Sequence, residues 1–340
     1  ELKATAFRYE TGVAGLRVQN SRSSMVVLPY MGMQVWFVTF DGRNVTQKSM
    51  FDMPLATTKF GDNYGAFLYH CGLNNVNGPE EGDPYPMHDV LPFAVYENTY
   101  TGVGVDEEGR YLAVGGTYVF RNRQELYWAY APELRLYEGK TMVEMKATVH
   151  NRRTHPLEYL WLCHMNWLGV DGGRFYYSAR QDPDHVLVAP TELGNDSPRA
   201  VAIREWGRKL ASDPTLADVL DSSSQVYDPE MCINYRYETD EDGWAHSLME
   251  LPGGGSYYVA WDATKAPYAL RWLCRTGDED GVGIAVPSTG TNRGSAYQRE
   301  HGHFNTLGPG ESDVLRWRFG LLDERETNDA KACIDSILGR

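Results

Sequence analysis

The sequence PLEYLWLCHMNW, residues 156–167, carries the clearest strand pattern in the chain. Alternate side chains of an extended strand point to the same face. One face here is wholly apolar or aromatic: Leu157, Tyr159, Trp161, Cys163, Met165 and Trp167. The other face becomes polar only at its end, where His164 and Asn166 follow Leu162. A strand that is apolar on both faces is covered on both, so His164 and Asn166 are predicted at the floor of a pocket. A buried structural histidine is the alternative for His164.

The composition is that of a globular protein rich in strands and turns. The 340 residues include 22 Tyr, 9 Trp and 34 Gly. A net charge of −14 disfavours nucleic acid and anionic membranes as partners, because both attract basic surfaces. The five cysteines are an odd, scattered set that does not form a disulfide framework. No apolar run has the length of a membrane span and no secretory segment opens the sequence, so we expect a cytoplasmic protein.

Short apolar runs separated by turn residues recur along most of the chain. They occur at residues 13–47 and 95–149, on either side of an irregular segment and a long loop, return at 231–275 and end with a strand at 315–324. Strands do not alternate with helices, which excludes Rossmann and barrel α/β enzymes. We therefore predict an all-β, antiparallel sandwich formed by one domain over residues 1–340.

Two segments interrupt the strand pattern. Residues of about 190–230, rich in Pro, Ser and Asp, are predicted to form an irregular or helical excursion. Within it, residues 212–221 are a short helix candidate with Ser212 as the N-cap. A C-terminal helix is predicted at about 328–338 from its apolar residues at helical spacing.

The candidate residues for chemistry are mostly histidines. The chain has no P-loop, no dinucleotide-binding glycine motif, no GxSxG and no HExxH. The candidate titratable side chains are His70, His88, His164, Glu230, Glu300, His301 and His303. Imidazoles and carboxylates that converge would support acid–base catalysis at neutral pH. The other histidines, including His246, are expected on the surface.

Several motifs, taken in order, resemble one family. These are HCGLNNVNGP (70–79), YPMHDVLPFAVYENTY (85–100), LCHMNW (162–167), YDPEM (227–231), LGPGES (307–312) and LRWRFGLL (315–322). Together they resemble the aldose 1-epimerase (galactose mutarotase-like) superfamily, and more narrowly its DUF4432-type epimerase-like branch. The resemblance implies a β-supersandwich with a cleft that binds a small-molecule sugar and needs no cofactor.

The resemblance also implies roles for individual residues. His88 and His164 match the two histidines that flank the sugar ring and exchange protons with it. Asn166 is expected to bind a sugar hydroxyl or to orient His164. Further sugar contacts are expected from His70, Asn74, Glu230 and His303.

One position departs from the family pattern. The segment GIAVPSTG, residues 283–290, has Val286 where the family has the glutamate that faces the anomeric carbon. Valine cannot accept a proton, so Glu300, or else Glu230, is the expected replacement. Two alternatives remain open: different sugar chemistry, by a keto-sugar isomerase or a lyase, or a non-catalytic carbohydrate-binding protein. The isomerase or lyase reaction would be metal-assisted if His70, His88, His164 and Glu300 held Zn, Mn or Fe.

Overall fold

The fold is an antiparallel sandwich of two large sheets, as predicted. The computed structural model describes residues 1–79, 83–123, 125–189 and 191–340. In these ranges the first sheet has twelve strands: β1 (Lys3–Arg8), β2 (Ala14–Gln19), β3 (Ser23–Leu28), β4 (Gln34–Phe40), β6 (Leu68–Leu73), β11 (Leu157–Met165), β18 (Asp280–Ser288), β17 (Tyr268–Arg275), β14 (Tyr227–Arg236) and β13 (Val186–Ala189) in spatial order, with β5 (Arg43–Asn44) beside β4 and β19 (Asn305–Leu307) beside β11.

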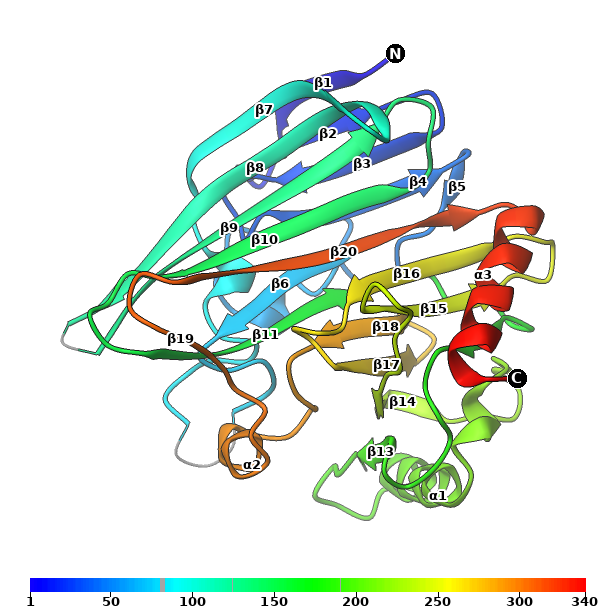
Figure 1. The fold of residues 1–340 in the computed structure, drawn as a ribbon. Coiled ribbons are helices and arrows are strands. Elements are labelled where there is room, and N and C mark those ends of the chain that lie inside the picture. Colours follow the sequence, from blue (N-terminus) through cyan, green and yellow to red (C-terminus); the bar gives the residue numbers. More distant parts are fainter. Residues whose placement is uncertain (80–82, 124, 190) are drawn as a thin grey trace.

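The second sheet has eight strands in the same described ranges: β12 (Arg174–Tyr177), β15 (Trp244–Glu250), β16 (Ser256–Asp262), β20 (Ser312–Leu322), β10 (Val143–Asn151), β9 (Leu126–Tyr137), β8 (Gly109–Asn122) and β7 (Glu97–Asp106). Figure 1 shows the two sheets lying against one another. The helices are α1 (Pro198–Ser212), α2 (Ser295–Glu300) and α3 (Glu324–Leu338), with 3-10 turns η1 (Phe60–Asp62), η2 (Leu91–Phe93) and η3 (Pro214–Ala217). No helix in the described part of the chain is long and apolar enough to cross a membrane.

Strand β11 separates two apolar clusters. This confirms the prediction that the strand is covered on both faces. Trp161, Cys163 and Met165 belong to the main core between the sheets. Leu160 and Leu162 belong to a second cluster on the opposite face of the twelve-stranded sheet. All five side chains are at most 1% exposed, so the strand is covered on both faces.

The helical excursion lies near one edge of the twelve-stranded sheet, by β13 and β14 (Figure 1). The predicted helix at 212–221 is wrong: α1 ends at Ser212, and only the short turn η3 follows. Helix α1 begins after Ser197, whose hydroxyl accepts a hydrogen bond from the Ala200 N–H, and Pro198 is favourable in its first turn.

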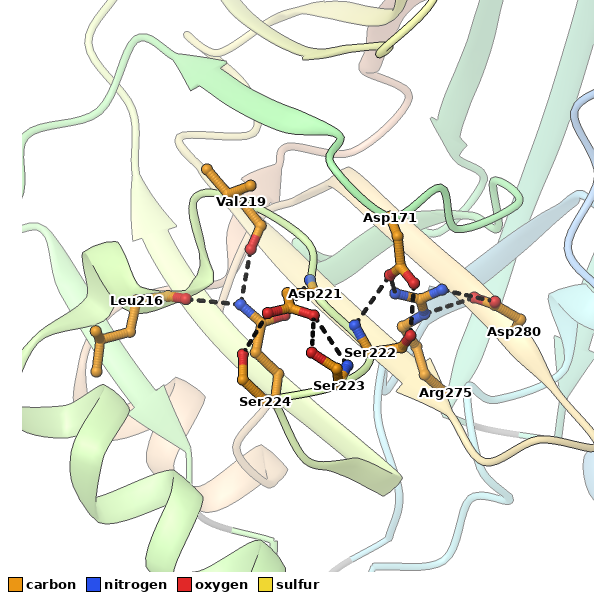
Figure 2. Close-up of polar contacts among 10 residues, drawn as sticks. Asp171, Leu216, Val219, Asp221, Ser222, Ser223, Ser224, Arg275 and Asp280 are labelled. Atoms are coloured by element: carbon orange, nitrogen blue, oxygen red, sulfur yellow. Dashed lines mark hydrogen bonds and ion pairs between the residues drawn. The ribbon is translucent and has the colours of Figure 1, made fainter.

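A cluster of polar contacts ties this excursion to the sheet (Figure 2). Arg275, near the end of β17, bonds Asp280 at 2.9 and 3.0 Å and Asp171 at 2.5 Å. The Ser222 hydroxyl and backbone N–H both donate to Asp171. These hydrogen bonds, with the guanidinium beside them, lower the pKa of Asp171 to about 2. The cluster fixes the turn between β17 and β18, which carries Glu279.

The C-terminal helix α3 is present and begins earlier than expected, at Glu324. Asp323 and Glu326 form a capping box that satisfies the first free backbone N–H groups. Ile334 packs with Leu248 and Tyr258 on the outer face of the eight-stranded sheet.

Candidate active site

A cavity of about 570 Å³ opens on the outer face of the twelve-stranded sheet. Its floor comes from β11, β14, β17 and β18, and its walls come from Met50 and from residues 60–64, 77–79, 87–88 and 292–294. The polar and ionisable side chains that line it are Tyr64, Asn77, His88, His164, Glu230, Cys232, Trp272, Glu279 and Asn292. The cavity therefore has the size and mixed lining of a site for a small polar molecule.

His164 reaches this cavity because it lies on the face of β11 opposite to Trp161 and Cys163. Its ring packs edge-on against Trp272, with ring centres 5.2 Å apart. Burial, and to a lesser extent the nearby His88, lower the pKa of His164 to about 3. The imidazole is therefore neutral at neutral pH. Its Nδ1 is buried without a hydrogen-bond partner among the described residues.

His88 reaches the same cavity from the long loop before η2. Its backbone has a φ of 58°, which is uncommon for a residue with a side chain. The conformation is held by hydrogen bonds from the His88 N–H to Asn77 O and from the Gly72 N–H to His88 O, both 3.1 Å. The rings of His88 and His164 have centres 5.6 Å apart and are nearly perpendicular. The structure thus brings together the two histidines that the sequence analysis paired.

The proton position on His88 follows from its neighbour. Its Nδ1 contacts the backbone carbonyl of Val76. A carbonyl oxygen only accepts hydrogen bonds, so Nδ1 carries the proton and Nε2 keeps a free electron pair. Burial lowers the pKa of His88 to about 4, although the bond to Val76 opposes this change. His88 therefore presents a neutral imidazole that accepts a proton through Nε2.

Asn166 orients the site from beneath rather than lining it. Its amide nitrogen donates to the Ala66 carbonyl at 3.0 Å, so its oxygen faces Tyr64, whose hydroxyl donates to it at 3.2 Å. The Tyr64 hydroxyl is also 3.3 Å from Nε2 of His164. If Tyr64 donates its single proton to Asn166, its oxygen accepts from Nε2–H of His164. Of the two roles expected for Asn166, the structure is consistent with the orienting one.

Two carboxylates lie in the cavity wall. Glu230, from β14, accepts a hydrogen bond from the Trp272 indole N–H at 2.5 Å. Glu279, in the turn before β18, lies in the same wall. Burial raises the pKa of Glu279, and the charge on Glu230 raises it further. Val286 also lines the cavity and is fully buried. Carboxylates are therefore present in the cavity, although not at position 286.

Three other residues assigned to the site lie elsewhere. Glu300 ends α2 with an exposed side chain and does not line the cavity, which corrects its expected place beside the histidines. His303 is buried against Gln298, 2.5 Å from its side-chain oxygen, and also lies outside the lining. Asn74 uses its amide and backbone N–H groups to bind Asp89.

His70 lies on the wrong face of β6 for a role in the cavity. It is opposite Cys163 in the strand pairing, and cross-strand partners share a face. Its ring is therefore in the core between the sheets, where Nδ1 is 2.9 Å from the Tyr130 hydroxyl. With His70 in the core and Glu300 on the surface, the suggested ligand set of His70, His88, His164 and Glu300 does not meet.

One other group of potential metal ligands is found among the described residues, under α3. It consists of Asp240, His246 and Cys333. His246 is 4% exposed, which corrects its expected surface position. Its Nδ1 is 2.6 Å from the Tyr258 hydroxyl and its Nε2 is 3.1 Å from an Asp240 oxygen. A Tyr258-to-His246-to-Asp240 series of hydrogen bonds satisfies these groups without an ion.

Sequence reasoning missed six polar residues of the cavity: Tyr64, Asn77, Cys232, Trp272, Glu279 and Asn292. Tyr64 lies in a segment that looks irregular, and Glu279 lies in the acidic turn GDED. Trp272 is in the strand pattern YALRWLC, where strand parity places it on the face opposite Arg271 and Leu273. The alternation of side chains along this strand could therefore have indicated Trp272.

Comparisons with known proteins identify the fold. No protein-family model and no curated protein sequence matches the chain. A candidate aldose 1-epimerase from Klebsiella pneumoniae subsp. pneumoniae MGH 78578 has a similar structure, with a TM-score of 0.79, 14% identity and coverage of 99% of this chain and 87% of that one. A galactose mutarotase-like protein from Clostridium acetobutylicum has a TM-score of 0.62, 13% identity and coverage of 95% and 99%.

A galactose mutarotase-like protein from Lactobacillus casei ATCC 334 has a TM-score of 0.54 and 12% identity, with 90% of this chain and 99% of that one covered. At these identities the likeness concerns the fold. The chain therefore has the all-β fold of galactose mutarotase-like proteins.

Proposed function

We propose that this protein is an aldose 1-epimerase-like isomerase that acts on a free sugar or sugar derivative. The observation that carries the proposal is the meeting of His88 and His164, from a loop and a distant strand, in one open cavity with two carboxylates. The solved structures that share the fold include proteins named for this activity. The narrower DUF4432-type assignment stays a prediction from the motifs.

The reaction needs a base at the anomeric hydroxyl and an acid at the ring oxygen. We assign the base to Nε2 of His88, because its electron pair is free and the imidazole is neutral. We assign the acid to Glu279, which is ionised in the free cavity and whose raised pKa eases the uptake of a proton once a neutral sugar covers it. His88 takes the hydroxyl proton, the bond between C1 and the ring oxygen breaks, and Glu279 protonates that oxygen. Rotation about the C1–C2 bond and the reverse steps give the other anomer.

Tyr64 is assigned to holding the sugar, and His164 to holding Tyr64 in place. Their hydrogen bond at 3.3 Å and the support of Tyr64 by Asn166 fix both groups at the cavity wall. Fixed polar groups bind hydroxyls with little loss of side-chain freedom. In this assignment His164 orients Tyr64 and is neither the acid nor the base.

A second candidate function is a non-catalytic sugar-binding protein. The buried Val286 favours it, because the family position for the carboxylate holds no proton acceptor. A metal-assisted sugar reaction through His70 and Glu300 is not proposed, because these residues do not reach the cavity.

Anomer exchange measured by NMR on a panel of aldoses separates the two candidates. An isomerase accelerates exchange above the spontaneous rate, and His88→Gln reduces that acceleration by at least about a hundredfold. His155→Gln, in an exposed turn, is the matched control and retains the rate. Sugar binding without faster exchange in the unmodified protein would favour the non-catalytic function.

A further inference from the structure

We infer that the cavity selects sugars that carry a protonated amine and rejects sugar phosphates and sugar acids. This inference rests on the proposed function only in taking the ligand to be a sugar. It comes from the charges that line the cavity and from the contacts that occupy the neighbouring cations.

The cavity is negatively charged. Glu230 and Glu279 line it, and no lysine or arginine is found among its lining residues in the described ranges. His88 and His164 add no positive charge at neutral pH, because burial lowers the pKa of His88 to about 4 and that of His164 to about 3. A phosphate or carboxylate entering this cavity would be desolvated beside two acidic groups without a compensating cation.

Two cations on the adjoining elements, Arg275 and Lys48, have other partners. Arg275, on the strand before Glu279, bonds Asp171 and Asp280 and its side chain is 11% exposed. The Lys48 ammonium donates to the Gly277 carbonyl. An anionic substrate would have to break such contacts to gain a counter-charge, which adds to the cost of binding it.

The two carboxylates favour a cation. Glu279 is partly buried, and both burial and the charge of Glu230 raise its pKa. Only one oxygen of Glu230 accepts from the Trp272 indole, and a carboxylate has further acceptor capacity. A protonated amine would donate up to three hydrogen bonds and would offset the repulsion between Glu230 and Glu279.

Matched ligands test this inference. Glucosamine, N-acetylglucosamine, glucose and glucose 6-phosphate are titrated by calorimetry at about pH 6.5, below the usual pKa of an amine. N-acetylation keeps a substituent at the same carbon and removes its charge. We expect glucosamine to bind at least about fivefold more tightly than N-acetylglucosamine or glucose, and glucose 6-phosphate to bind most weakly.

Variants locate the preference. Glu279→Gln should bring glucosamine to within about twofold of glucose, whereas Asp278→Asn makes the same change in net charge outside the lining and should keep the preference. Equal effects of both variants, no preference for the amine, or tight binding of the phosphate would overturn the inference.

The outcomes also separate this inference from the proposed function. Faster anomer exchange of neutral sugars without an amine preference would overturn the inference alone. An amine preference without faster exchange of any sugar would support the inference and overturn the isomerase. Absence of binding to all four ligands would overturn both.

Discussion

Replacing His70 by glutamine tests the assignment of this histidine to the core instead of the cavity. His70 is fully buried between the sheets. The Tyr130 oxygen accepts from the Trp161 indole N–H, and its own proton is available for donation to Nδ1 of His70, 2.9 Å away. Protonating His70 would place a charge in the core between the sheets. Burial lowers the pKa of His70 to about 3, well below the value of about 6.5 in an unfolded chain.

The magnitude follows from linkage between protonation and folding. Below about pH 6.5 His70 binds a proton in the unfolded chain but stays neutral in the folded core. The free energy of unfolding therefore has its full value above that pH and decreases as the pH falls. Each pH unit is worth about 1.4 kcal/mol, so His70 accounts for a loss of about 1.5–2 kcal/mol between about pH 6.5 and pH 5. His88 and His164 have pKa values of about 4 and about 3 and add comparable losses.

Urea unfolding at several pH values measures this effect. The loss of stability between about pH 6.5 and pH 5 should be smaller in His70→Gln than in the unmodified protein by about 1.5–2 kcal/mol. His155→Gln, in an exposed turn, should leave the loss unchanged. Sugar binding should survive in His70→Gln, because the ring lies on the face of β6 away from the cavity. An unchanged pH dependence, or loss of sugar binding in a folded variant, would refute the reasoning.

Three further predictions concern the site and its supports. Tyr64→Phe removes the hydroxyl between His164 and Asn166 and should weaken sugar binding about tenfold with little change in Tm; unchanged binding would remove the assigned role. Arg275→Met should lower the free energy of unfolding by about 1–3 kcal/mol in urea titrations, whereas Arg199→Met, which breaks an exposed pair, should cost less than about 1 kcal/mol; equal losses would contradict the importance of the Arg275 cluster. The pH–rate profile of anomer exchange should keep its activity from neutral pH down to about pH 5, because His88, with a pKa of about 4, stays unprotonated there; an acid limb near about pH 6.5 would indicate a histidine with an ordinary pKa.

The alternation of side chains along a strand made part of the site predictable, because it assigns each residue to one of two faces. The alternation of β11 placed Trp161 and His164 on opposite faces, and the structure has them there. For His70 the deciding fact is the register of β6 on β11, which pairs it with Cys163. Register depends on long-range pairing, and a shift of one residue would have put His70 on the cavity face.

Turns and helix boundaries were harder to predict for a different reason. His88 takes a positive φ that no residue pattern indicates, and Glu279 is placed by the packing of the turn between β17 and β18. Helix α1 did have signals in Ser197 and Pro198, and in the buried residues Ile203 and Leu210 at helical spacing. The high content of Pro, Ser and Asp around it masked that pattern.

A crystal structure with glucosamine bound tests the central claim most directly. If His88 is the base of a sugar site, the anomeric oxygen should lie about 2.6–3.2 Å from Nε2 of His88, with the amine beside Glu279. A sugar held on another face of the molecule, or turned so that its anomeric carbon points away from His88, would contradict the claim.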